Sequence, residues 1–168
     1  EKYILPLVSK YAEINGLGLA CVIDDIDNEY PEKNRNKKKT WQKFLVPYAL
    51  SKLVESAVNI CYFDSDILFN PYGKNLFDYH DESQISLVSQ IYDLPGNEQI
   101  AKKIISFSRN KFYSDLYPLD SAIFMSTKQY YEFNGYKPFD DICCAGLYIA
   151  NINNHEKGLR KIFCKYEN

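Results

Sequence analysis

The sequence lacks several features that would place it in well-known classes of protein. No apolar run approaches the roughly 20 residues that a membrane-spanning helix needs. No basic and then apolar signal segment opens the chain. The formal net charge is −2, so the positive excess that nucleic-acid-binding proteins carry is missing. We therefore expect neither a transmembrane segment nor a nucleic-acid partner.

The cysteines and histidines also lack the spacings that mark disulfide frameworks and zinc sites. The five cysteines form no C-x-x-C pair and have no zinc-like spacing with the two histidines, His80 and His155. Unpatterned cysteines in odd number indicate reduced thiols and a cytoplasmic protein. With 168 residues, 46% of them hydrophobic and 25% charged, the chain has the composition of one globular domain.

Apolar spacing and turn residues predict helices that alternate with strands, which is typical of an α/β sheet. Helices are expected at residues 4–14, 41–56, 97–107 and 127–133. Strands are expected at residues 17–23, 58–63, 85–91 and 122–125, and residues 147–152 form either a strand or the beginning of the last helix. Gly16 is expected to end the first helix, and Pro47 to interrupt the second.

Two carboxylates, Asp64 and Asp66, follow directly after the predicted strand at residues 58–63. Open α/β sheets bind their ligands at the carboxyl ends of strands. Two such carboxylates can chelate one hard divalent cation and leave coordination positions for phosphate oxygens. Apolar residues on both sides make this an unfavourable place for solitary charges. The pattern favours a metal and diphosphate site over a plain turn at a strand end.

Four segments resemble nucleotide-sugar glycosyltransferases of the GT-A fold. Tyr62-Phe63-Asp64-Ser65-Asp66-Ile67-Leu68 resembles the aspartate-x-aspartate signature of that family. Residues 10–16 resemble its first helix, residues 41–44 the segment with a cationic side chain near the diphosphate, and residues 144–151 the motif that lines the sugar pocket. The resemblance implies a single α/β domain over residues 1–168, with a mixed, mostly parallel sheet flanked by helices. The family's first strand has no counterpart before the helix at residues 4–14.

This resemblance also implies an activity and a set of site residues. The activity is metal-dependent transfer of a sugar from a nucleoside-diphosphate sugar, with a UDP-sugar as the expected donor, to a hydroxyl group of a glycan, a lipid-linked acceptor or a protein. Mn²⁺ or Mg²⁺ would bind to Asp64 and Asp66. Residues that would contact the donor are Lys43, Ser65, Cys144, Ala145 and Gly146. Asp24 and Asp25, at the end of the strand predicted at residues 17–23, either approach the ribose or base of the donor or form an ordinary turn. Cys144 stands where the family has an asparagine.

Asp140 and Asp141 are candidates for a catalytic base. They follow residues 121–136, which are similar to the strand, helix and turn that precede the base in inverting enzymes of this fold. An aspartate in a closed, apolar pocket could have its pKa raised enough to deprotonate an acceptor hydroxyl. The alternative for these two residues is an exposed turn, so the stereochemical outcome stays open.

Two other functions are compatible with the sequence. In an aspartyl-nucleophile phosphohydrolase, Asp64 would attack phosphorus and Asp66 would act as acid and base. The third possibility is a non-catalytic domain that binds a sugar nucleotide.

Overall fold

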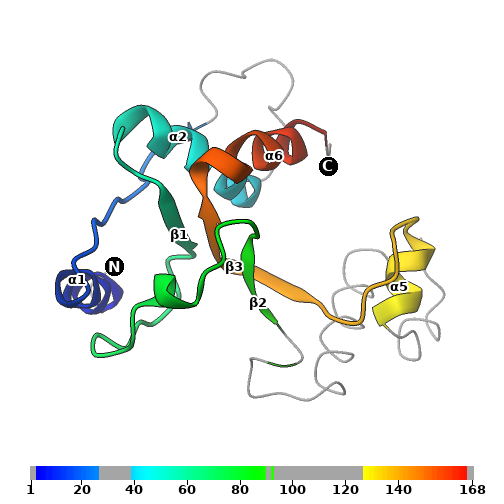
Figure 1. The fold of residues 1–168 in the computed structure, drawn as a ribbon. Coiled ribbons are helices and arrows are strands. Elements are labelled where there is room, and N and C mark those ends of the chain that lie inside the picture. Colours follow the sequence, from blue (N-terminus) through cyan, green and yellow to red (C-terminus); the bar gives the residue numbers. More distant parts are fainter. Residues whose placement is uncertain (1–2, 27–38, 90–91, 93–126, 166–168) are drawn as a thin grey trace. The chain divides into compact units, whose positions relative to one another are not determined.

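The computed structural model describes residues 3–26, 39–89, 92 and 127–165, and it shows a mixed α/β protein (Figure 1). The elements in chain order are α1 (Ile4–Ile14), the 3-10 helix η2 (Lys39–Leu45), α2 (Val46–Leu53), β1 (Asn59–Phe63), the 3-10 helix η3 (Leu76–Tyr79), β2 (Ser86–Ser89), α5 (Thr127–Phe133), β3 (Cys143–Asn151) and α6 (Ile152–Lys165). They belong to two compact units, Glu1–Ser86 with Gly146–Asn168, and Leu87–Ala145. None of the described helices is long and apolar enough to cross a bilayer.

Within the described part of the chain, three strands form a sheet in the order β1-β3-β2. Strands β1 and β3 run antiparallel, with Ile60 opposite Ala150 and Tyr62 opposite Tyr148. Because side chains alternate between the two faces of a strand, these four residues share one face of the sheet. The mixed α/β character is therefore confirmed, whereas the described strands do not show the mostly parallel sheet that the resemblance implies.

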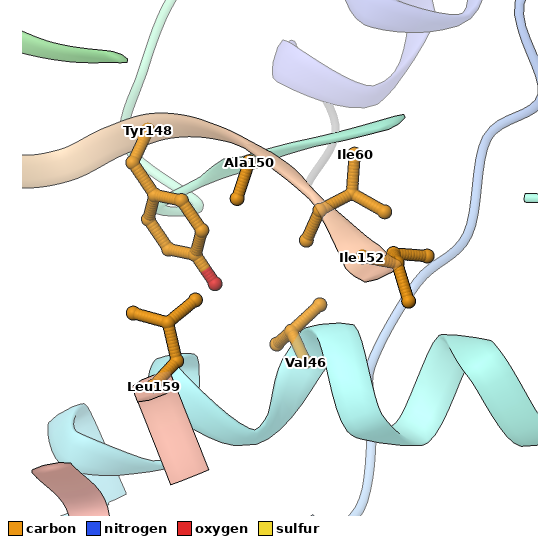
Figure 2. Close-up of a cluster of buried hydrophobic side chains, with 6 residues drawn as sticks. All are labelled: Val46, Ile60, Tyr148, Ala150, Ile152 and Leu159. Carbon is orange, nitrogen blue, oxygen red and sulfur yellow. The ribbon is translucent and has the colours of Figure 1, made fainter. Parts of the chain in front are cut away.

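Helices α2 and α6 cover this face of β1 and β3. Figure 2 shows side chains from both strands directed toward Val46 of α2 and Leu159 of α6. The cluster is buried throughout, with Ala150 completely inaccessible to solvent. Burying one large apolar side chain contributes about 1.5–3 kcal/mol to the free energy of folding. This cluster therefore stabilises the first unit.

The opposite face of β1 carries Phe63, whose ring contacts Phe69 edge-on at a centroid distance of 4.7 Å. The ring of Tyr11 from α1 lies 5.2 Å from the Phe69 ring. The Tyr11 hydroxyl donates a hydrogen bond to the Lys74 carbonyl oxygen at 2.9 Å and accepts one from the Leu76 N–H at 2.8 Å. The Tyr11 side chain thus attaches α1 to the segment that follows the acidic pair.

Helix α1 has the predicted bounds, and the chain leaves it through Gly16, whose φ of +64° favours glycine. The strand predicted at residues 17–23 is wrong. The structure has no strand there, and the side chain of Ile23 is 87% exposed. An apolar segment becomes a strand only when its backbone groups pair with a neighbouring strand, and none of the three described strands pairs with it.

The helix predicted at residues 41–56 is two elements, η2 and α2, and Pro47 marks the change. Pro47 lies in the first turn of α2, where its missing N–H removes no helical hydrogen bond. The second element ends at Leu53, so the predicted apolar face does not extend to residue 56. Helix α5 confirms the helix predicted at residues 127–133. Of the two alternatives for residues 147–152, the strand is observed, because β3 begins at Cys143 and continues to Asn151. The elements predicted at residues 97–107 and 122–125 lie outside the described residues.

Candidate functional site

Asp64 lies directly after the last residue of β1, as the sequence predicts. Its N–H donates a hydrogen bond of 2.7 Å to the Gly146 carbonyl oxygen of β3. Its own carbonyl oxygen accepts a hydrogen bond from the Ile67 N–H at 3.1 Å, which closes a turn around Ser65 and Asp66. Both of these turn residues are exposed. The acidic pair therefore begins where β1 and β3 separate.

Lys43 and Tyr62 both contact the Asp64 carboxylate. The Lys43 ammonium lies 3.2 Å from each carboxylate oxygen, and the Tyr62 hydroxyl donates a hydrogen bond of 2.6 Å to Oδ1. A hydroxyl donor at this distance is typical of a charge-assisted hydrogen bond. The Lys43 side chain is only 11% exposed, whereas the Asp64 side chain is 38% exposed. The carboxylate is thus accessible from solvent while the ammonium beside it is nearly enclosed.

Tyr62 and Tyr148 connect this ion pair to the sheet. Their rings are stacked at a centroid distance of 5.3 Å. The Tyr148 hydroxyl donates a hydrogen bond of 2.6 Å to the carbonyl oxygen of Lys43. Burial raises the pKa of both tyrosines above its ordinary value, and for Tyr62 the hydrogen bond to Asp64 adds to the effect of burial. Both hydroxyls therefore stay protonated and keep donating.

The other residues predicted to bind the donor lie on the surface before η2 or on strand β3. Asp24 and Asp25 are exposed, and the Ile26 N–H that follows them donates to Gln42 Oε1 at 2.7 Å, next to Lys43 in η2. Cys144 and Ala145 are partly buried on β3 and belong to the second unit, whereas Gly146 is buried in the first.

Asp140 and Asp141 also belong to the second unit, where Asp140 is exposed and Asp141 is partly buried. Asp140 is 67% exposed and forms a salt bridge of 2.9 Å with Lys128 of α5. Asp141 accepts a hydrogen bond of 2.6 Å from the N–H of the next residue, Ile142. The closed, apolar pocket expected around a catalytic base does not surround Asp140.

Sequence reasoning missed the two tyrosines of the site. Tyr62 could have been found, because residues two apart on a strand share a face and Tyr62 precedes Asp64 by two. Tyr148 could not, since its place opposite Tyr62 depends on a strand register that joins positions 86 residues apart.

The donor atoms at the acidic pair fit a hard divalent cation, which prefers carboxylate oxygens. In the part of the chain that the structure describes, no three side chains of histidine, cysteine, aspartate or glutamate converge on one point. Asp64 and Asp66 are the residues that would hold such a cation.

Comparison with known proteins identifies no relative of this chain. No family model, no curated protein and no solved structure matches the chain.

Proposed function

We propose that this protein is a glycosyltransferase domain of the GT-A type, which binds a nucleoside-diphosphate sugar with Mn²⁺ or Mg²⁺ at Asp64 and Asp66. The observation that carries the proposal is the meeting of three segments that are distant in sequence. Asp64 bonds to Gly146 of β3 and pairs with Lys43 of η2. These are the three segments whose sequences resemble the metal, sugar and diphosphate motifs of that family.

Each part of the site has a task in this proposal. The chemistry that a divalent cation supplies is neutralisation of the diphosphate that leaves the sugar. Lys43 brings a second positive charge to the same place, and Tyr62 orients the Asp64 carboxylate. The finer fold that we propose is a mixed, mostly parallel GT-A-like sheet that includes β1 and β3. We propose Asp140 or Asp141 as the acceptor base; Asp140 is exposed and paired with Lys128, whereas Asp141 is partly buried.

Calorimetric titration of UDP into the protein, with and without Mn²⁺, tests the donor site. We expect UDP to bind only when Mn²⁺ is present, and the double variant Asp64→Ala/Asp66→Ala to lose this binding, because two acidic ligands are removed. The matched control is Glu55→Ala/Asp78→Ala, which removes two exposed carboxylates of the same unit. Circular dichroism checks that each variant is folded. Equal UDP binding by both double variants would contradict the proposal.

Turnover assays with the same preparation separate the three candidate functions. A glycosyltransferase is expected to hydrolyse its sugar nucleotide slowly in the absence of an acceptor. A phosphohydrolase would release phosphate from an aryl phosphate instead, and a non-catalytic domain would bind UDP without either activity.

A further inference from the structure

Lys43 occupies the position from which a cation would neutralise Asp64. Its ammonium is equidistant from both carboxylate oxygens, at 3.2 Å, and lies 5.4 Å from the centre of the Tyr62 ring. The carbonyl oxygen of Lys43 is held by the buried Tyr148 hydroxyl. The backbone of Lys43 is therefore anchored to the sheet, while its ammonium ends a flexible chain of four methylene groups.

A divalent cation at Asp64 and the Lys43 ammonium repel each other. Two cations that share one carboxylate lie within about 4 Å of each other, a distance at which like charges interact strongly in a partly buried site. A cation that uses both oxygens of Asp64 must therefore displace the ammonium. The displaced ammonium remains close to the site, because its backbone stays anchored.

We propose that Lys43 is a competing internal cation that couples the binding of the metal to the binding of the diphosphate. This inference rests on the proposed function of Asp64 and Asp66. The metal alone binds weakly, because its binding breaks the ion pair between Lys43 and Asp64. A nucleoside diphosphate accepts the displaced ammonium on its phosphate oxygens, so the two ligands bind better together than separately. By linkage, each ligand raises the affinity of the other by the same factor.

Substituting Lys43 is expected to change the two affinities in opposite directions. Lys43→Met keeps most of the apolar side chain and removes the charge. Without the competing ammonium, Mn²⁺ alone should bind about 2- to 5-fold more tightly, the change expected when one partly exposed charge interaction is removed. UDP should bind more weakly to the Mn²⁺-saturated variant than to the Mn²⁺-saturated native protein, because the diphosphate loses a cationic partner. A lysine that only supports the fold would weaken both affinities.

The experiment is a titration of Mn²⁺ followed by electron paramagnetic resonance, together with calorimetric titration of UDP at saturating Mn²⁺. The native protein, Lys43→Met and the control Lys10→Met are compared. Lys10 forms an exposed salt bridge of 2.9 Å with Glu13 on α1, so it tests the loss of one paired lysine elsewhere. Lys43→Gln repeats the test with a polar side chain if the methionine variant unfolds.

The outcomes distinguish this inference from the proposed function. Tighter Mn²⁺ binding together with weaker UDP binding in Lys43→Met, and neither change in Lys10→Met, supports the coupling role. If the native protein binds Mn²⁺ and UDP but Lys43→Met shifts both affinities in the same direction or shifts neither, the coupling role is overturned and the donor site stands. If the native protein binds neither ligand, the donor site and the coupling role both fail.

Discussion

Replacing Tyr148 with alanine is expected to lower the free energy of unfolding by about 3–5 kcal/mol, the usual cost of truncating a large buried aromatic residue. Tyr148 is 2% exposed and belongs to the cluster between the sheet and helices α2 and α6. The truncation removes its stacking on Tyr62 and its hydrogen bond to Lys43. Unfolding in urea, followed by circular dichroism, measures the loss.

Two further variants separate the contributions of the Tyr148 ring and hydroxyl. Tyr148→Phe keeps the ring and leaves the Lys43 carbonyl oxygen without this donor, so we expect a loss of about 1–3 kcal/mol. Tyr72→Ala removes an exposed tyrosine of the same unit and should change the unfolding free energy by no more than about 0.5 kcal/mol. A Tyr148→Ala effect as small as that of Tyr72→Ala would contradict the packing described for β3.

Cys61 is expected to resist alkylation about a thousandfold better in the folded protein at pH 8 than after unfolding in urea, because only the thiolate reacts. Cys61 lies in the middle of β1, and burial raises the pKa of its thiol to about 12. Treatment with iodoacetamide followed by peptide mass spectrometry measures the modification of each cysteine. The exposed Cys21 and Cys164 should be modified first, and they are the internal comparison.

The same pKa shift predicts how stability depends on pH. Folding keeps the Cys61 thiol neutral, whereas the unfolded chain can ionise it at an ordinary pKa of about 8.5. The stability that depends on Cys61 is therefore complete below about pH 8.5 and decreases as the pH rises toward 12. Urea unfolding at pH 7 and pH 10 should show a smaller decrease for Cys61→Ala than for the native protein. An identical decrease would mean that Cys61 is not protected by burial.

The parts of the fold that could be predicted from sequence depend on neighbours in the chain. Helix α1 was recognisable because its apolar residues recur at helical spacing and Gly16 provides its left-handed end. Strand β1 was recognisable from an apolar run that stops at Asp64. Pro47 indicates an interruption of the predicted helix. It does not indicate that the segment before it is a 3-10 helix and the segment after it an α-helix.

The features that could not be predicted from sequence depend on contacts between residues that are distant in the chain. Residues 17–23 have the composition of a buried strand, but a strand also requires a neighbour for its backbone, which no local pattern specifies. The contact between Lys43 and Asp64 likewise joins η2 to the end of β1. Sequence resemblance suggested that these two residues share a ligand, but it did not indicate that they pair with each other.

The attachment of α1 through the Tyr11 hydroxyl has a consequence for local motion. The Leu76 amide proton is covered by a side chain of α1 rather than by a backbone partner from the sheet. If α1 lifts away, this proton becomes open to exchange with solvent while the amides shared by β1 and β3 stay protected. Detachment of the first helix and loss of the sheet are thus separate opening events, and the Leu76 amide is the position where the first of them becomes visible.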